Sequence, residues 1–329
     1  VASKPSWMCP EKHNKFETIC RYDFNRFSEI GVRKVAKVPS DAPVYKNVAR
    51  MTYVMQDDPL WRKLLIGSIE FMTGQRKLNK LYQQYQNQKT IDANIWGDAI
   101  ERLKLNLMCN QNPALAIPKQ GPLILVSNHP FGVLDGLALC YLTSLARSDF
   151  KFLAHSTFKK IPEIAPFVLP IDFDGASSAL RSNIQTKHSA VKHVRSGGAI
   201  VIFPAGRVST RKRPLTEATD ADWKLFCGSL IQKSEASVLP VFFAGENSAL
   251  FHLASIVGEV MRESLLMFEI VRRMNSDVHA SLGELIDYRD LRNIADKNQL
   301  LTYLRDQVYA LKTTTESYVS VGNLATATR

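Results

Sequence analysis

The stretch that decides the fold is GPLILVSNHPFGVLDGLALC, residues 121–140. It opens with a short, unbroken apolar run, which is typical of a strand buried on both faces. The run ends in Asn-His-Pro, and a glycine turn follows. From Asp135 onward the pattern is helical, with the aspartate placed where a helix would start. A buried strand that passes through a tight turn into a helix is a building unit of α/β proteins.

Working outward from this stretch, short apolar runs alternate with amphipathic stretches as far as residue 286. Such alternation predicts an α/β fold with a mostly parallel central sheet flanked by helices. The expected strands are FKFLAH (150–155), PFVLPIDF (166–173), GGAIVIFP (197–204), SVLPVFFAG (237–245) and VHASLGELI (278–286). The expected helices begin at Asp135 and at Asp222, or cover 177–195, 248–274 and 290–313.

An N-terminal helical segment is expected before the sheet. In its first part Leu60, Trp61 and Leu64 are spaced as on one face of a helix. That face fits a helix packed on the core, and it also fits a helix lying at a membrane interface. Further helices are expected over 76–86 and 95–108. The predicted division is a basic N-terminal arm (1–57), N-terminal helices with a candidate membrane-interface element (58–120), the α/β domain (121–290), and a C-terminal helix and tail (291–329).

The chain is strongly basic, with a net charge of +11 and a pI of about 9.4. Such a charge predicts an anionic partner, which could be nucleic acid, an acidic membrane surface or an acidic carrier protein. The five cysteines are odd in number and contain no CxxC pair, so a disulfide framework and a zinc site are not expected. No apolar run approaches the roughly 20 residues that span a bilayer, so any membrane contact is expected to be peripheral.

His129 and Asp135 are the first candidates for chemistry. His129 follows a predicted strand, and ligands in α/β sheets bind at the carboxyl ends of strands. A histidine that acts as a base needs one free ring nitrogen, and a carboxylate on the other nitrogen fixes its tautomer and raises its basicity. The alternative is structural, since an aspartate in this place also caps a helix and a loop histidine is often an ordinary polar residue.

A second strand end carries a basic run, IVIFPAGRVSTRKR, residues 200–213. Arg207, Ser209 and Arg211 follow the strand, together with other cations and a second hydroxyl. Such groups suit a phosphate or a carboxylate. A solvated basic loop with no ligand is the alternative.

Four blocks in order carry a family resemblance. NHPFGVLDG, KKIPEIAPFVLPID, FPAGRVS and LPVFFAGENS resemble the glycerolipid acyltransferases typified by the 1-acylglycerol-3-phosphate enzymes. The nearest branch is the bacterial hemolysin-like or lyso-ornithine-lipid O-acyltransferase type, which shares the Asp-Trp pair found here at Asp222 and Trp223. The resemblance covers roughly residues 75–290, so it implies the glycerolipid acyltransferase fold for this region.

The resemblance implies transfer of a fatty acyl group from a thioester to the hydroxyl of a lysolipid, in membrane lipid biosynthesis. His129 would be the general base, and Asp135 would orient it. The donor would be acyl-carrier protein or acyl-coenzyme A as a co-substrate, with no bound cofactor and no metal. The enzyme would work in the cytoplasm, attached peripherally to an anionic inner membrane face. The implied substrate-binding set is Asn128, Gly132, Phe203, Pro204, Gly206, Arg207, Ser209 and Arg211.

Two departures from the broad family qualify the acceptor. Five residues separate His129 from Asp135 where the family has four, and Gly132 could absorb the extra residue. Ala205 replaces a glutamate, which changes the charge expected beside Arg207. An amino-acid-containing lysolipid is therefore as good an expectation as lysophosphatidic acid. A lipid-binding scaffold with weak catalysis is the alternative, and nucleic-acid binding is not expected because no reader motif is present.

Overall fold

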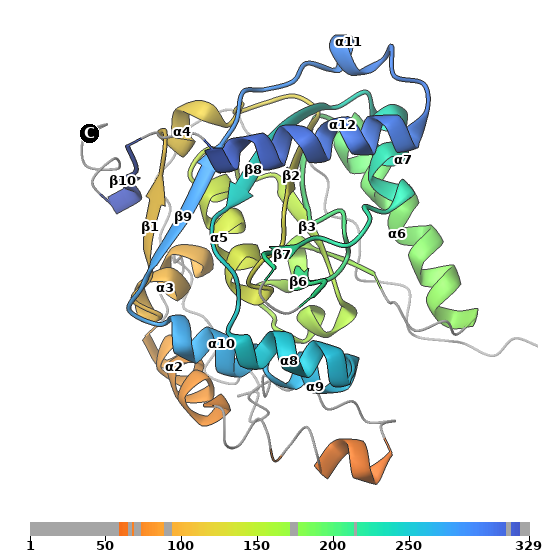
Figure 1. Cartoon of the computed structure of the whole chain (residues 1–329). Helices are drawn as coiled ribbons and strands as arrows, with labels where there is room; N and C mark the ends of the chain where they lie inside the picture. The colour runs from red at the N-terminus through yellow and green to blue at the C-terminus, as the bar shows by residue number, and fades with distance from the viewer. Residues whose placement is uncertain are drawn as a thin grey trace, which may run out of the picture. The chain divides into compact units, whose positions relative to one another are not determined.

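The computed structural model describes residues 59–64, 68, 74–88, 94–171, 177–213, 216–313 and 317–322. An eight-stranded sheet forms the centre of this part of the chain (Figure 1). The predicted arm 1–57 lies outside these residues. The strand order is β10-β1-β9-β8-β2-β5-β3-β4. The strands are β1 (Asn106–Cys109), β2 (Leu123–Ser127), β3 (Phe150–Ala154), β4 (Val168–Pro170), β5 (Ala199–Ile202), β8 (Ser237–Phe243), β9 (Asp277–Leu282) and β10 (Val319–Ser320).

The sheet is mostly parallel, as predicted. Strands β8, β2, β5, β3 and β4 run parallel to one another, and β1 pairs in parallel with β9. Only the β8–β9 and β1–β10 pairs are antiparallel. The strand ends that carry the sequence motifs therefore meet at one edge of the sheet, where β8, β2 and β5 lie side by side.

Helices cover both faces of this sheet, and β2 shows how the sequence achieves it. All five of its residues are buried, because alternate side chains enter two different cores. Leu123 and Leu125 pack into one core, and Ile124 and Val126 pack into the other. This two-sided burial explains the unbroken apolar run in the sequence.

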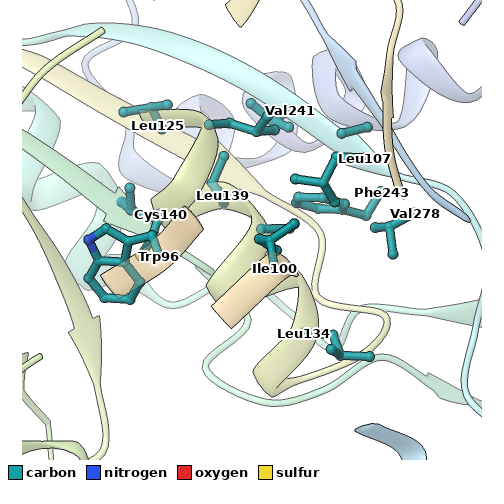
Figure 2. Close-up of a cluster of buried hydrophobic side chains, with 14 of the residues drawn as sticks. Trp96, Ile100, Leu107, Leu125, Leu134, Leu139, Cys140, Val241, Phe243 and Val278 are labelled. Atoms are coloured by element: carbon teal, nitrogen blue, oxygen red, sulfur yellow. The ribbon is translucent and has the colours of Figure 1, made fainter. Parts of the chain in front are cut away.

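The first core holds helices α3 (Ile95–Arg102) and α5 (Val133–Ser144) against the sheet. Figure 2 shows Trp96 and Ile100 of α3 and Leu139 of α5 gathered beneath strand residues. The second core lies under α6 (Ser177–Arg195), α7 (Leu225–Ser234) and α12 (Lys297–Ala310). The other helices are α2 (Gln75–Gln88), α4 (Pro113–Ala116), α8 (Ala249–Val257), α9 (Glu259–Ser264), α10 (Leu266–Arg273) and α11 (Tyr288–Leu291), with short 3-10 turns at Ser156–Lys160, Ala165–Phe167 and Leu311–Thr313.

Two helix predictions were wrong. The helix expected over 95–108 ends at Arg102, and Asn106–Cys109 forms β1 instead. Lys104 takes a positive φ of 52°, and the following leucines at 105 and 107 are buried while Asn106 is exposed, which is the alternation of a strand. The single helix expected over 248–274 is three helices, α8, α9 and α10, because the chain turns at Gly258 and again at Leu265.

Two further helices have boundaries that differ from the sequence prediction. The helix expected over 290–313 spans Lys297–Ala310. The helix expected from Asp222 begins at Leu225, and the loop before it contains an unpredicted hairpin of β6 (Thr210–Arg211) and β7 (Ala218–Thr219). This hairpin folds the basic run back toward the sheet edge.

The apolar side chains near the N-terminus of the described residues face outward. Leu60, Trp61 and Leu64 are 78%, 63% and 69% exposed, so a helix buried on the core is not what these residues form. Arg62 lies 3.9 Å from Glu263, measured between Nη2 and Oε2, which places this segment beside α9. None of the helices described is both long enough and apolar enough to cross a bilayer.

Three cysteines lie in the described part of the chain, and all three are buried free thiols. Burial raises the pKa of the Cys109 and Cys227 thiols to about 12, and that of Cys140 well above its ordinary value. Cys9 and Cys20 fall outside the described residues.

Candidate active site

The carboxyl end of β2 is built around Asn128. Its side-chain amide donates to the carbonyl of Phe243 at 2.9 Å, and its oxygen accepts the Phe243 N–H at 2.7 Å. The residue is 4% exposed. Asn128 therefore joins the end of β2 to the end of β8 and leaves little of its amide for a substrate, contrary to the binding role predicted for it.

A tight turn brings His129 and Asp135 together. Asp135 is the third residue of α5 and is fully buried. One carboxylate oxygen accepts the N–H of Phe131 at 2.8 Å, and the other lies 2.8 Å from Nδ1 of His129. The helix begins at Val133 with Gly132 as its N-cap, so the prediction that Asp135 starts and caps the helix was wrong. The carboxylate instead ties the turn to the first turn of the helix and contacts the histidine ring.

Gly132 makes this turn possible. It has a φ of 81°, in the region that favours glycine, and it stands at the N-cap position of α5. A Cβ atom there would lie 2.9 Å from Leu266 Cδ2 and 3.1 Å from Val208 Cγ2. The five residues between His129 and Asp135 fit because the glycine takes this conformation, so its role is to shape the turn.

The ring of His129 is held on two sides. It stacks on Phe203, with ring centroids 4.0 Å apart, so Phe203 supports the histidine. Nδ1 faces Asp135, while no polar group of the described residues contacts Nε2, and 17% of the side chain is exposed. Burial alone lowers the pKa of His129, but the charge and contact of Asp135, and then the charge of Asp220, reverse that effect and raise the pKa above its ordinary value.

Asp220 is the residue that the sequence prediction missed. It is 1% exposed and accepts the backbone N–H of His129 at 3.1 Å, the hydroxyl of Ser209 at 2.5 Å and the indole N–H of Trp223 at 3.0 Å. The sequence analysis had named nearby Asp222 only as a helix start and as part of the Asp-Trp pair, and that residue is exposed. The usable signal was Trp223, because a buried indole N–H needs an acceptor and Asp220 is three residues before it in the same loop.

The loop after β5 presents Arg207 at the surface. Gly206 has a φ of 67° and turns the chain outward. Arg207 is exposed and makes no ion pair with any residue that the structure describes, and its role in binding an anionic headgroup stays a prediction. Pro204 and Ala205 are buried instead, Ala205 within the second core. The Ala205 side chain therefore lies in the core and not on the surface that carries Arg207. The change in charge expected from the missing glutamate stays a prediction.

The other polar residues of this loop are already engaged. Ser209 is buried and donates to Asp220, so its hydroxyl is not offered to an anion. Arg211 forms an ion pair with Glu246, and its Nε donates to Oε2 at 3.1 Å. The hydrogen bond from Arg211 lowers the pKa of Glu246. Arg211 thus links the hairpin to the loop after β8, and its charge is balanced within the protein.

The loop after β8 and helix α8 hold buried polar groups that make no hydrogen bond to the described residues. Neither end of the Asn247 amide has a hydrogen-bond partner, although the residue is 3% exposed. Both ring nitrogens of His252, on α8, are also without a hydrogen bond, although Nε2 lies 3.5 Å from Oε2 of Glu246, and burial lowers the pKa of this histidine. Unpaired buried polar groups are costly and are often satisfied by ordered water or a ligand. Across the described ranges, no three His, Cys, Asp or Glu side chains gather as they would around a metal ion.

A sequence model of an acyltransferase family matches residues 114–317, a span that contains every residue of this site. The chain belongs to this acyltransferase family. Its curated relatives include a lyso-glycine lipid O-acyltransferase from Phocaeicola vulgatus, 27% identical over 206 residues, which are 59% of this chain and 70% of that protein. Another, with the same description and from Bacteroides thetaiotaomicron, is 28% identical over 205 residues, 59% of this chain and 72% of that protein.

Among solved structures, this acyltransferase is similar to the 1-acyl-sn-glycerophosphate acyltransferase PlsC from Thermotoga maritima. The identity is 16% and the TM-score 0.41, over 79% of this chain and 83% of that one. The glycerolipid acyltransferase resemblance and the prediction of an acyltransferase enzyme are confirmed. The hemolysin-like and ornithine-lipid branch stays a prediction.

Proposed function

We propose that this acyltransferase moves a fatty acyl group from a thioester to the hydroxyl of a lysolipid, with His129 as the general base. The observation that carries the proposal is the contact between His129 Nδ1 and Asp135 Oδ1 at 2.8 Å, which leaves Nε2 as the free ring nitrogen. A ring held in this way has a defined tautomer, with the proton on Nδ1 and the lone pair on Nε2.

The reaction needs one proton carrier and no acyl-enzyme, because the thioester is already activated. Nε2 takes the proton of the lysolipid hydroxyl as its oxygen attacks the thioester carbonyl carbon. The tetrahedral intermediate then collapses, the carbon–sulfur bond breaks, and the imidazolium returns the proton to the departing thiolate. Asp135 stabilises the imidazolium between these steps, which favours the charged form of the ring.

The acceptor that we propose is a lysolipid with an amino-acid headgroup, and lyso-glycine lipid is the first candidate. Two relatives are named for that acceptor. Arg207 is the exposed cation beside the site and suits a carboxylate headgroup. Acyl-carrier protein and acyl-coenzyme A are both proposed as donors.

The deciding experiment compares wild type with His129→Ala on a panel of acceptors. The panel holds lyso-glycine lipid, lyso-ornithine lipid and lysophosphatidic acid, each with both donors. We expect turnover on an amino-acid lysolipid that falls about 10²–10⁴-fold in the variant, as for the loss of a general base. No turnover by the wild type on any acceptor, or an equally active variant, would overturn the proposal.

We also propose that α8 rests on an anionic membrane. Its outer face carries four apolar side chains that are each at least half exposed: Leu250, Leu253, Ile256 and Val257. The inner face of α8 packs on Val208 and Leu266, the same residues that enclose Gly132. Hairpin β6–β7 lies beside α8, with Lys212 and Arg213 exposed (Figure 1). An apolar face rimmed by cations suits a bilayer that contains anionic lipids.

Vesicle flotation tests this placement. The double variant Leu253→Asp/Ile256→Asp is expected to bind phosphatidylglycerol-containing vesicles about tenfold more weakly, because two apolar contacts are lost and two negative charges gained. Leu115→Asp on α4 is the matched control, since Leu115 is 74% exposed away from this face. Equal vesicle binding by the double variant and the control would contradict the proposed membrane surface.

A further inference from the structure

A groove of about 800 Å³ runs between α6 and α7, on the face of the sheet opposite α5. The two helices lie side by side in Figure 1. Apolar side chains line the groove, and two of them, Ile184 on α6 and Leu225 on α7, are about half exposed. Phe226 also lines it and lies under the ammonium of Lys187, 5.6 Å from the ring centroid.

The charged groups of this groove are all cationic. Lys187, Lys192 and Arg195 project from α6, and Lys233 projects from α7. All four are exposed, and no Asp or Glu is among the described residues that line the groove. An apolar floor between two basic rims is complementary to a helix with an apolar ridge and acidic flanks.

The groove starts close to the proposed base. Helices α6 and α7 both run antiparallel to the strands of the central sheet, so their N-terminal ends lie at the edge that carries His129. Lys224, just before α7, donates its N–H to the carbonyl of Pro204 at 2.9 Å. Trp223 donates to Asp220, which in turn accepts the N–H of His129. A partner seated between the helices would therefore have one end beside the site.

We infer that this groove docks an acidic helix of the acyl-carrier protein that delivers the acyl thioester. The inference rests on the proposed function. It goes further by distinguishing the two donors, because only the carrier protein would contact the groove. A coenzyme A thioester has no helix to seat and does not need the groove. The groove thus sets specificity for a protein-bound donor, and its contribution depends on salt because it is electrostatic.

The test compares one acyl chain carried by acyl-carrier protein and by coenzyme A. Lys192→Glu/Lys233→Glu reverses one charge on each side of the groove. We expect kcat/KM for the acyl-carrier-protein thioester to fall about tenfold or more relative to wild type. The kcat/KM for the acyl-coenzyme A thioester should stay within about twofold of wild type. The control is Lys104→Glu/Lys119→Glu, which makes the same charge change at two exposed lysines outside the groove and should leave both donors equally active.

A second variant and a binding measurement keep the result clear if turnover is weak. Leu225→Asp places a negative charge on the apolar floor at the first turn of α7, a position that tolerates an acid. Fluorescence anisotropy of labelled holo-carrier protein should show weaker binding to both groove variants than to wild type. Unchanged carrier binding and kcat/KM in the groove variants, or an equal loss with both donors, would overturn the inference. Inactivity of the wild type with both donors would instead remove the proposed function, while carrier binding would still report on the groove.

Discussion

Two buried carboxylates contact the same histidine from different parts of the chain. Asp135 comes from the helix that follows the turn and meets the imidazole at Nδ1. Asp220 comes from the segment after hairpin β6–β7 and meets the backbone N–H of the same residue. The first can act on the protonation of the ring, and the second holds the turn in place through Ser209 and Trp223. Burial and closeness to a histidine therefore do not by themselves assign a role, because the atom that is contacted decides it.

The largest effect is expected for Asp135→Asn. An amide keeps the size of the side chain and can still accept the N–H of Phe131. It would donate to Nδ1, however, and so force the proton onto Nε2, where the proposed base needs its lone pair. We expect kcat to fall about 10²–10⁴-fold with little change in the free energy of unfolding. Steady-state kinetics and a thermal melt measure these two quantities. Turnover within a few-fold of wild type would show that Asp135 has no larger catalytic role than Asp220.

Asp220→Asn should have the opposite effect to Asp135→Asn, with a larger loss of stability than of turnover. An amide cannot accept all the hydrogen bonds that Asp220 accepts from its three donors, so buried polar groups lose partners. We expect a loss of about 1–3 kcal/mol in the free energy of unfolding and a fall in kcat of less than about tenfold. Denaturant unfolding measures the first quantity. Asp222→Asn is the matched control, because Asp222 is exposed and should tolerate the change.

Ser209→Ala removes only one of the three hydrogen bonds that Asp220 accepts. It therefore tests the contribution of that single bond to stability. The hydroxyl is buried and donates to Asp220, while the backbone N–H of Ser209 donates to the carbonyl of His129 at 2.8 Å and stays in place. We expect a loss of about 1 kcal/mol in unfolding free energy and near-normal turnover. A large drop in affinity for the anionic acceptor without loss of stability would restore the headgroup role first predicted for this residue.

The pH dependence of kcat/KM tests how each carboxylate affects the pKa of His129, which is the smallest of the expected effects. The proposed base must be deprotonated, so kcat/KM should rise with pH through the pKa of His129. Burial lowers that pKa, Asp135 raises it most strongly, and Asp220 adds a smaller rise. The acidic limb of the wild type should therefore lie above the ordinary range of histidine. It should move toward lower pH in Asp220→Asn, because one raising charge is lost. A limb that stays in place would show that Asp220 does not act on the ring at all.

The sequence predicted this edge of the sheet well because its signals are local. An unbroken apolar run such as LILVS requires a strand buried on both faces, and β2 is that strand. His129 and Asp135 are six residues apart on one turn, so their contact follows from the turn itself. The parallel order of β8, β2 and β5 follows from strands that alternate with helices.

What could not be predicted depends on contacts between distant segments. Asp220 is 91 residues from His129, and only the packing of the hairpin against the sheet edge brings them together. The sequence predicted Arg211 to be available for a substrate because its partner, Glu246, lies in the loop after another strand, β8. The helix expected over 248–274 has a suitable pattern throughout, and its breaks near Gly258 and Leu265 arise where three short helices fold over the active-site loops.

The buried thiols bear on the proposed thioester donor. An acyl thioester exchanges readily with a thiolate, and a protein with reactive cysteines would acylate itself. Cys109, Cys140 and Cys227 are buried and have raised pKa values, so they remain protonated at neutral pH. These three described sulfur atoms are therefore not expected to compete with the acceptor hydroxyl for the proposed donor.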